Sequence, residues 1–367
     1  MTQKTPQKTI LIAPLAWGLG HAARCIPIIK ELKSYNIEVI IVADEPVKTM
    51  LKQEFPQLFF IDLPGYKIQY SKNKKWFHLK ILFQLPQIIT CIFKEHNWLK
   101  KVVKKYAVDA VISDNRFGLY HSTIPSVYIT HQLFIKTGNW FSEKIAEKIH
   151  GWGIKKYNQC WVPDFDGAVN IAGVLSHPKA LPANIKYIGC LSRFEKTATV
   201  NKEINLLIIL SGPEPQRTIF ENILFTQLRE YTGRVLFVRG LAAVGHNLVF
   251  TDEPGLPNEI IIKNYLSATE LNTAIQSAEL VLCRSGYTSV MDLLKLNQKA
   301  VLVPTPGQTE QEYLAAYLSG QQFFCTASQD GFLLQDVINK ANKFSYQMPV
   351  CDMELYKKTI QLFVETL

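Results

Sequence analysis

The sequence between residues 280 and 316 predicts a strand-helix-strand unit, which limits what this chain can fold into more than any other feature. The apolar runs 280–283 and 300–303 have the length and composition of buried parallel strands. Residues 288–296 between them carry apolar side chains at helical spacing. Because parallel strands need a crossover of this kind, the unit predicts an open α/β sheet.

Polar residues follow both predicted strands, at the edge where open α/β sheets bind ligands. The turn 284–286, Arg-Ser-Gly, comes directly before the predicted helix. The free backbone N–H groups at a helix start favour a bound phosphate. Asp292 lies further along the helix, where its carboxylate can accept hydrogen bonds from the hydroxyl groups of a ribose. The sequence therefore predicts a nucleotide site at this edge.

This order of motifs resembles the nucleotide-sugar half of family-28 glycosyltransferases. The matching residues are Arg284, Ser285, Gly286, Asp292, Val303, Pro304 and the polar loop residues Gln308, Glu310 and Gln311. The family most often has Glu where this chain has Asp292. The resemblance implies the α/β GT-B fold, with two Rossmann-like domains facing each other across a cleft. The alternative is an ordinary strand-helix-strand unit with a polar loop.

Two domains are expected for a chain of 367 residues, because a single hydrophobic core seldom grows that large. The charged segment 195–203 separates two series of alternating strands and helices. We expect a Rossmann-like, acceptor-binding domain at 1–194 and a nucleotide-sugar donor-binding domain at 195–351. The amphipathic segment 352–367 is expected to pack back onto the first domain, as the last helix usually does in two-domain glycosyltransferases.

The composition indicates a globular protein, with 47% hydrophobic and 19% charged residues. The seven cysteines are scattered, with none in CxxC spacing, which favours reduced thiols over a zinc site or a disulfide framework. The first residues show no signal-peptide pattern, and no apolar run has the length of a membrane span. We expect a cytoplasmic protein, with contact at the inner face of the membrane as an open alternative.

A glycine-rich loop, Gly18-Leu19-Gly20-His21, follows the first predicted strand. With Asp44 after the second strand, it offers a GxGxxA dinucleotide fingerprint. In that fingerprint the strand runs directly into its first glycine, whereas here the segment APLAW intervenes. Family-28 enzymes carry a comparable loop ending in Gly-His, and the resemblance places Gly18 and Gly20 beside the cleft. We favour the glycosyltransferase interpretation and expect no cofactor, with the UDP-sugar as co-substrate.

His21 is the candidate general base, because an imidazole titrates near neutral pH and can take a proton from an attacking hydroxyl. The alternative is a histidine that lines the loop without chemistry. Asp114 ends the predicted strand 110–113, and the pair resembles the His–Asp pair of inverting plant-type glycosyltransferases. Asp114 is equally suited to capping its own turn. His131 ends the next predicted strand and competes with Asp114 for the supporting role.

The resemblance implies further donor contacts: Arg193 for the diphosphate, Ser211 and Gly212 in a phosphate loop, and Tyr265 and Leu266 beside the uracil ring. Arg193 belongs to a Gly-x-x-x-Arg segment that begins at Gly189. The phosphate loop departs from the family pattern, because Pro213 and Pro215 stand where glycines are common. Each proline removes one amide donor, so fewer phosphate contacts are expected from this loop.

Residues 66–106 hold ten lysines against a single acid, Glu95, with aromatic and aliphatic residues between them. Such a segment suits an anionic membrane surface or a polyprenyl-phosphate acceptor. A solvated basic helix pair whose apolar face belongs to the core is the alternative. Nucleic acid binding is not expected, because the sequence contains no recognised RNA- or DNA-binding module.

The sequence thus predicts an inverting, metal-independent glycosyltransferase. It would move a hexose or N-acetylhexosamine from a UDP-sugar to a hydroxyl or phosphate acceptor, either lipid-linked or part of a cell-envelope glycan. A UDP-sugar 2-epimerase of the same architecture is one alternative, although it needs several carboxylates in the cleft. A non-catalytic nucleotide-sugar binding protein is another, which Pro213 and Pro215 keep open.

Overall fold

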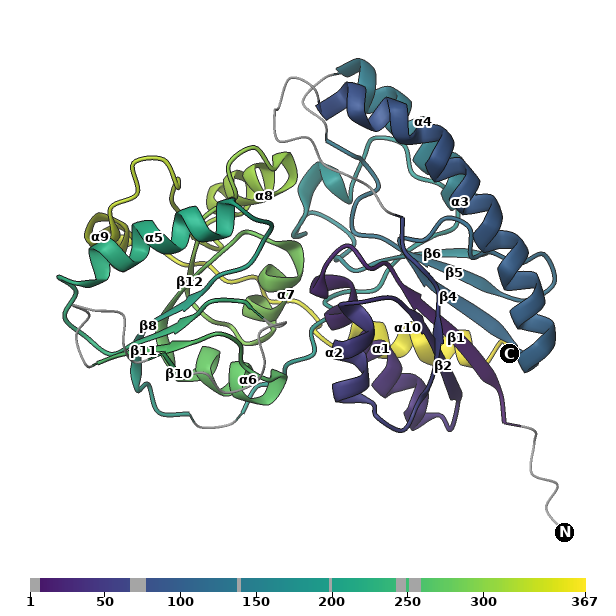
Figure 1. The fold of residues 1–367 in the computed structure, drawn as a ribbon, viewed down its shortest axis with the longest axis horizontal. Coiled ribbons are helices and arrows are strands. Elements are labelled where there is room, and N and C mark those ends of the chain that lie inside the picture. The colour runs from purple at the N-terminus through teal and green to yellow at the C-terminus, as the bar shows by residue number, and fades with distance from the viewer. Residues whose placement is uncertain (1–6, 67–76, 137–139, 198–199, 242–248, 251–258) are drawn as a thin grey trace, which may run out of the picture. The chain divides into compact units, whose positions relative to one another are not determined.

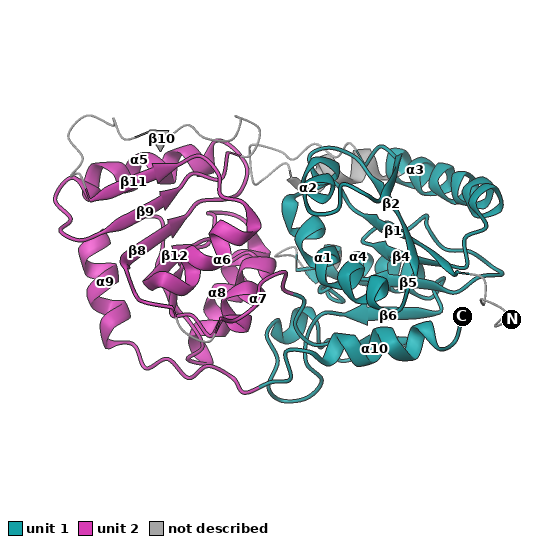
Figure 2. Cartoon of the chain, turned by 90° about the horizontal axis from the view of Figure 1, so that it is seen from below, with its two compact units in different colours: residues 1–191, 351–367 teal, residues 192–350 magenta. Residues whose placement is uncertain are grey.

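The structure is a computed structural model that describes residues 7–66, 77–136, 140–197, 200–241, 249–250 and 259–367. The chain divides into two compact units (Figures 1 and 2). Unit 1 comprises residues 1–191 and 351–367, and unit 2 comprises residues 192–350. This border lies close to the one that the sequence predicts between residues 194 and 195.

Unit 1 is built on a seven-stranded parallel sheet with the strand order β3-β2-β1-β4-β5-β6-β7. This order is that of a Rossmann sheet, extended by one strand. Every residue of the central strand β1 is buried. The strands are β1 (Thr9–Pro14), β2 (Glu38–Ala43), β3 (Phe59–Asp62), β4 (Ala110–Asp114), β5 (Ser126–Ile129), β6 (Gln159–Val162) and β7 (Ile185–Tyr187).

Both faces of this sheet are apolar, so helices cover both. Ile10 and Ile12 of β1 share a core with the first and last helices of the chain, whereas Leu11 and Ala13 face the opposite core. The last helix, α10, contributes Ile360 and other side chains to the first core and therefore packs on α1. The helices are α1 (Leu19–Ser34), α2 (Val47–Glu54), α3 (Phe77–Tyr106), α4 (Trp140–Ile154), a 3-10 turn (Gly173–Leu175) and α10 (Leu355–Val364).

Unit 2 repeats the arrangement with the strand order β10-β11-β9-β8-β12-β13-β14. Its pairings are parallel, except that the short edge strand β10 runs antiparallel to β11. The strands are β8 (Ile204–Ile209), β9 (Val235–Val238), β10 (Val249–Phe250), β11 (Ile260–Lys263), β12 (Ala278–Cys283), β13 (Ala300–Leu302) and β14 (Cys325–Thr326). The predicted unit at 280–316 is thus confirmed as β12, α7 and β13.

The helices of unit 2 are α5 (Gln216–Leu228), α6 (Ala268–Ser277), α7 (Tyr287–Lys295), α8 (Thr309–Gly320) and α9 (Leu334–Lys343). α6 begins with a capping box, in which Ser267 and Glu270 satisfy each other's backbone N–H groups. The other described helices of this unit begin without a side-chain hydrogen bond from the N-cap residue. The predicted α/β class with two Rossmann-like units is confirmed.

Candidate active site

The carboxyl ends of β1, β4 and β5 bring three predicted residues together in unit 1. His21 lies in the first turn of α1, which follows β1. Asp114 is the last residue of β4, and His131 follows the end of β5. Because these three strands are neighbours in the sheet, the residues that follow them meet at one edge.

A hydrogen-bonded cluster joins these side chains. Nδ1 of His21 lies 3.1 Å from Oδ2 of Asp114, which is fully buried. The guanidinium of Arg24, one turn along α1, donates to both carboxylate oxygens of Asp114, with Nε 2.7 Å from Oδ2. The same guanidinium lies 2.8 Å from Nδ1 of His21 and 2.8 Å from Nδ1 of His131. The structure therefore adds Arg24 to the predicted set.

The electrostatics of this cluster suit a general base. Burial alone would raise the pKa of Asp114, but the charges of Arg24 and His21 outweigh it and lower that pKa to about 2. Burial lowers the pKa of His21, against the opposing effect of Asp114. At neutral pH the site thus holds an ionised carboxylate beside a neutral imidazole, which is the state that proton abstraction requires.

The sequence contains a signal for Arg24 that motif comparison passes over. Arg24 stands in an otherwise apolar helical run, on the face of α1 that is buried. A buried arginine is rarely found without a carboxylate partner. Its side chain is only 3% exposed, so its position in the run indicates a buried ion pair.

An exposed tryptophan stands on the loop between β1 and α1, shortly before His21. Trp17 is 47% exposed, while its indole N–H donates to the carbonyl of Tyr66 at 3.1 Å. The hydroxyl of Tyr66 donates to Glu95 on α3 at 2.6 Å. Glu95 is in turn paired with the buried Arg116. This network holds the loop and its exposed indole in place.

Asp44, the acidic residue of the rejected dinucleotide fingerprint, accepts hydrogen bonds from backbone N–H groups. Its carboxylate accepts from the N–H of Glu45 at 2.9 Å and from the N–H of Gly65 at 3.2 Å. Gly18, the N-cap of α1, has no described heavy atom within 4 Å of the place where a Cβ would stand. The space beside the glycine loop is therefore open, and Gly20 lies within the first turn of α1.

In unit 2, the loops after β8, β12 and β13 form the predicted donor edge, because these strands are neighbours. Gly212 in the first loop has a φ of +104°, and a Cβ there would stand 3.6 Å from Oγ1 of Thr305 in the third loop. α7 and α8 begin at Gly286 and Gln308, neither of which caps its helix with a side chain. The first turn of α7 has no acidic residue, so its first N–H groups suit the oxygens of a phosphate. The first turn of α8 carries Glu310 and Glu312, and Oε1 of Glu312 accepts from the N–H of Gly307 at 2.7 Å.

The start of α5 carries a carboxylate that is bonded to the helix itself. Glu214 accepts a hydrogen bond from the N–H of Thr218 at 3.2 Å and another from Nε of Arg217 at 2.6 Å. The carboxylate of Glu214 thus occupies the helix start that follows Ser211 and Gly212. At this loop the protein supplies its own anion where the family resemblance implies a phosphate contact.

Arg284 supports the donor edge from within unit 2. Its guanidinium stacks over the ring of Phe220, at 4.5 Å from the ring centroid. Its remaining contacts are to oxygen atoms of the protein: the carbonyls of Val303, Pro304 and Gln216 at 3.3, 3.2 and 3.1 Å, and Oε1 of Gln329 at 2.7 Å. These bonds tie the ends of β12 and β13 to the start of α5, so the described contacts give Arg284 a positioning role.

The polar loop after β13 divides into inward and outward residues. The hydroxyl of Ser285 donates to the carbonyl of Gln311 at 2.8 Å. Oε1 of Gln311 accepts from the N–H of Thr305 at 2.9 Å, so Gln311 holds the loop in shape. Gln308 is exposed and Glu310 is half-buried. Of the three polar residues predicted to read the donor sugar, these two reach the surface.

Asp292 lies on α7, buried, with a partner from the start of unit 2. Oγ of Ser192 donates to Oδ1 of Asp292 at 2.5 Å. Burial raises the pKa of Asp292 to about 6, although the charge of Arg193 and the bond from Ser192 act in the opposite direction. Nε of Arg193 is buried and has no hydrogen-bond partner among the described residues. Arg193 and Asp292, both predicted donor contacts, are thus near each other.

The segment predicted to lie beside the uracil ring follows β11. Leu266 is buried, and Tyr265 is half-buried. Arg239 at the end of β9 is paired with Glu221, Nε to Oε1 at 2.5 Å, and donates to Asn264 at 3.3 Å. This pairing fixes the start of the segment.

The sequence contains one Asp-x-Asp spacing, at Asp164-Phe165-Asp166. Asp164 is fully buried and accepts hydrogen bonds from three backbone N–H groups and from the hydroxyl of Ser176. Its oxygens therefore hold the loop after β6. Within the described ranges, no three His, Cys, Asp or Glu side chains are grouped as metal ligands.

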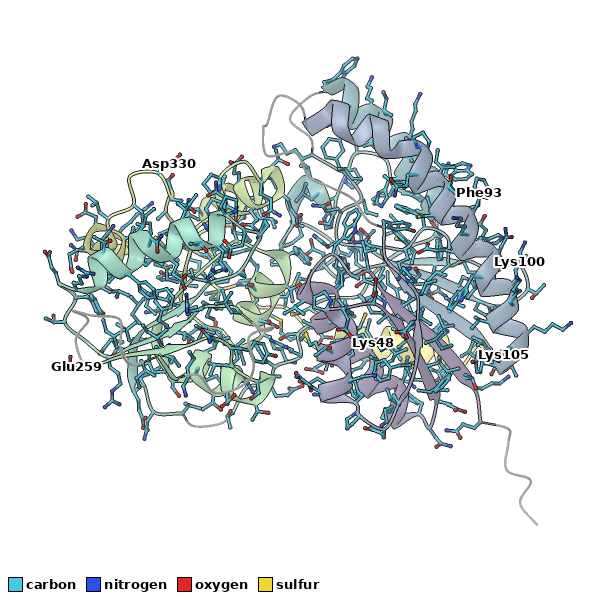
Figure 3. The ribbon with its side chains drawn as sticks, viewed as in Figure 1. Lys48, Phe93, Lys100, Lys105, Glu259 and Asp330 are labelled. Atoms are coloured by element: carbon cyan, nitrogen blue, oxygen red, sulfur yellow. The ribbon has the colours of Figure 1, made fainter. Side chains whose placement is uncertain are left out.

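The outer faces of α3 and α4 combine apolar and basic side chains. Phe93, which is 61% exposed, and the exposed Lys100 and Lys105 lie along the outer side of α3 (Figure 3). The inner side of this helix contributes Leu99 and Val102 to the core. Residues 67–76 of the predicted basic segment lie outside the described residues.

α4 has an apolar surface face of its own. Ile145, Ile149 and Trp152 are exposed and recur at helical spacing on one side of the helix, and Trp140 at its first residue is exposed as well. Nζ of Lys144 lies 4.3 Å from the ring centroid of Trp140, and Nζ of Lys156 lies 4.8 Å from that of Trp152. Of the helices in the described part of the chain, none is long and apolar enough to cross a membrane.

Comparison with solved structures agrees with this architecture. The glycotransferase of kitacinnamycin aligns with a TM-score of 0.63 at 12% identity, covering 99% of this chain and 96% of that one. The spinosyn rhamnosyltransferase SpnG aligns with a TM-score of 0.61 at 13% identity, covering 97% of this chain and 100% of that one. MurG of Acinetobacter baumannii aligns with a TM-score of 0.55 at 14% identity, covering 98% of this chain and 100% of that one. At these identities the likeness concerns the fold, which is the GT-B fold.

Sequence comparison extends the likeness to the class of enzyme. Residues 234–352 match the glycosyltransferase family 28 C-terminal domain. The UDP-N-acetylglucosamine–N-acetylmuramyl-(pentapeptide) pyrophosphoryl-undecaprenol N-acetylglucosamine transferase of Haemophilus ducreyi is 24% identical over 344 residues, covering 90% of this chain and 88% of that protein. The chain is a glycosyltransferase of the GT-B class. Within that class it resembles family 28, whose C-terminal domain it carries.

Proposed function

We propose that this protein transfers a hexose or N-acetylhexosamine from a UDP-sugar to a hydroxyl group of a lipid-linked or cell-envelope glycan, with inversion at the anomeric carbon. The observation that carries the proposal is the pairing of a neutral His21 with an ionised Asp114. A phosphate acceptor is already ionised and needs no base, so this pairing favours a hydroxyl acceptor. UDP-N-acetylglucosamine, which the name of the H. ducreyi relative contains, is the first donor to test.

In this mechanism the cluster around His21 acts on the acceptor hydroxyl. Nε2 of His21 takes the proton of the acceptor hydroxyl as its oxygen attacks the anomeric carbon. The bond from that carbon to the UDP oxygen breaks, and the bonding electrons leave with UDP. Asp114 stabilises the imidazolium that forms. A single displacement of this kind inverts the configuration of the anomeric carbon.

The departing diphosphate is stabilised by groups of unit 2. The start of α7 presents backbone N–H groups, and Arg193 adds a positive charge near Asp292. Asp292 accepts hydrogen bonds from the ribose, while Gln308 and Glu310 contact the donor sugar. Because these groups supply the positive potential that leaving UDP requires, we propose that the reaction needs no metal ion. Full activity in the presence of EDTA is the expected result, and activity that returns only with added magnesium or manganese would refute it.

The acceptor is proposed to be held at an anionic membrane surface, at its cytoplasmic face. The exposed Phe93 and the lysines of α3 support this proposal, together with Trp152 and the other apolar side chains on α4. Aromatic side chains beside lysines are typical of helices that lie in the membrane interface. The H. ducreyi relative carries a pyrophosphoryl-undecaprenol acceptor in its name, so such lipid-linked glycans are the first acceptors to test.

The decisive experiment separates turnover from donor binding. His21→Ala is expected to abolish transfer from UDP-N-acetylglucosamine to a lipid-linked glycan, while calorimetric titration shows unchanged UDP affinity. A non-catalytic binding protein would bind the donor without turnover in the wild type. A 2-epimerase would change the configuration of the donor sugar without any acceptor. Equal loss or equal survival of binding and turnover in His21→Ala would count against His21 as the base.

A further inference from the structure

Arg24 contacts every other polar member of the unit 1 cluster, and its contacts restrict where the histidine rings carry their protons. A guanidinium stays charged in proteins and only donates hydrogen bonds. A ring nitrogen that faces it at hydrogen-bond distance must therefore be a bare acceptor. Arg24 is almost fully buried, so no bulk water competes for these bonds.

This rule assigns the tautomer of His131. Its Nδ1 lies 2.8 Å from Nη1 of Arg24 and must accept that hydrogen bond. The ring therefore carries its single proton on Nε2. A histidine in this form donates from Nε2 and has no lone pair there. It follows that His131 is a hydrogen-bond donor and not a second base.

His21 is in a different position, because two neighbours make opposite demands on its Nδ1. Oδ2 of the ionised Asp114, at 3.1 Å, can only accept and requires a proton on Nδ1. Nη2 of Arg24, at 2.8 Å, requires the same nitrogen to be bare. One nitrogen cannot satisfy both demands at once. With a proton on Nδ1 the lone pair is on Nε2 and His21 is a base, whereas with a bare Nδ1 it is only a donor.

We propose that Arg24 is a positioning residue that sets the tautomers of both histidines. It keeps His131 in the Nε2–H form, and it competes with Asp114 for Nδ1 of His21. His21 is a base only in those molecules in which Nδ1 carries the proton and donates a hydrogen bond to Asp114. The catalytic consequence rests on the proposed function, whereas the assignment of the tautomers rests only on the geometry of the cluster.

The test is NMR spectroscopy of the full chain with ¹⁵N-labelled histidine, in which long-range ¹⁵N–¹H correlations distinguish the two neutral tautomers. The chain has eight histidines, so the signals of the two rings are assigned from His21→Gln and His131→Gln. The expected wild-type result is a single Nε2–H form for His131 and a mixture of both forms for His21. Either an Nδ1–H or a doubly protonated His131 ring near neutral pH would overturn the proposal.

Arg24→Lys provides the second arm, because lysine keeps the charge but presents one nitrogen in place of the planar fork. His21 is expected to move to the Nδ1–H form, bonded to Asp114, and His131 is expected to lose its single tautomer. Unchanged spectra in Arg24→Lys would overturn the proposal. Lys30→Gln, which alters an exposed charge on the same helix, is the matched control and is expected to leave both rings unchanged.

A positioning role also has a kinetic signature. The charge of Arg24 lowers the pKa of His21, so its removal in Arg24→Gln is expected to shift the acidic limb of the kcat/KM profile to higher pH. An unshifted limb in a folded variant would contradict the proposal. If neither arginine variant folds, the wild-type spectrum still tests the proposal, because the tautomer of His131 can be read from that spectrum alone. If the wild-type protein shows the expected spectrum but transfers no sugar, the proposed function is refuted and the assignment of the tautomers is supported.

Discussion

Ser192 donates a hydrogen bond of 2.5 Å to Asp292, so the carboxylate proposed to hold the ribose already has a protein partner. Asp292 is also buried, and burial raises its pKa to about 6. A UDP-sugar must therefore share this carboxylate with the Ser192 hydroxyl or displace it. Two consequences can be measured, one for donor binding and one for stability.

UDP-N-acetylglucosamine is expected to bind about tenfold more weakly at pH 5 than at pH 7. Asp292 takes up a proton near pH 6 and then accepts fewer hydrogen bonds from the ribose. Calorimetric titration across this range measures the effect. Asp292→Asn is the control and is expected to bind weakly at every pH. A wild-type affinity that stays constant would argue against Asp292 as the ribose contact.

Asp292→Asn is expected to stabilise the fold at pH 8 while it weakens donor binding. A carboxyl group whose pKa is raised on folding contributes stability below its unfolded pKa, and that contribution is lost as the pH rises through about 6. The amide of Asn does not titrate and avoids this loss, so the free energy of unfolding at pH 8 is expected to rise by up to about 3 kcal/mol. Urea unfolding of both proteins at pH 4 and pH 8 measures the difference, which is expected only at pH 8. A variant that is less stable at both pH values would contradict this account.

Arg284→Met is expected to destabilise unit 2 by about 3 kcal/mol, because it leaves buried carbonyl groups and Gln329 without their donor. Burial lowers the pKa of Arg284 only to about 10, so it is charged at neutral pH. Urea unfolding measures the loss. Arg234→Met removes an exposed arginine of the same unit and is expected to change stability little. Equal effects of the two changes would show that the contacts of Arg284 are unimportant.

Combined Phe93→Asp and Trp152→Asp is expected to abolish sedimentation of the protein with vesicles of phosphatidylglycerol. Each change places a negative charge on an exposed apolar position of α3 or α4. Wild-type binding is expected to fall in high salt and with phosphatidylcholine vesicles. Val350→Asp, on the exposed surface of unit 2, is the matched control. Equal sedimentation of all three proteins would remove the membrane proposal and leave the glycosyltransferase proposal standing.

Much of the fold could be predicted from local patterns. The unbroken apolar runs 280–283 and 300–303, which fall at β12 and β13, are recognisable, because a strand buried on both faces leaves such a run. Asp114 and His131 were also predictable as neighbours, since each stands at the end of a strand and parallel strands end at one edge. The predicted glycine loop was wrong in extent, because Gly18 alone precedes α1 as its N-cap, whereas Leu19, Gly20 and His21 lie in the first turn of the helix.

The direction of individual side chains at these edges was not predictable in the same way. Arg284 stands in a motif that indicates a ligand contact, yet its guanidinium donates to oxygen atoms of three other segments of the chain. Glu214 looks like an ordinary loop residue in the sequence, but in the structure its carboxylate accepts a hydrogen bond from a backbone N–H at the start of α5. Sequence spacing does not show such partners, because they come from segments far apart in the chain.

Periodicity and turn chemistry are local properties, so the amino-acid sequence predicts the alternation of strands and helices, the two Rossmann-like units and the polar residues at the ends of several strands. How those residues pair depends on the folded chain. The tertiary structure placed Arg24 between Asp114 and two histidines, and Ser192 against Asp292. The physical reason is that a buried polar group must find its hydrogen-bond partner wherever the fold brings one within about 3 Å.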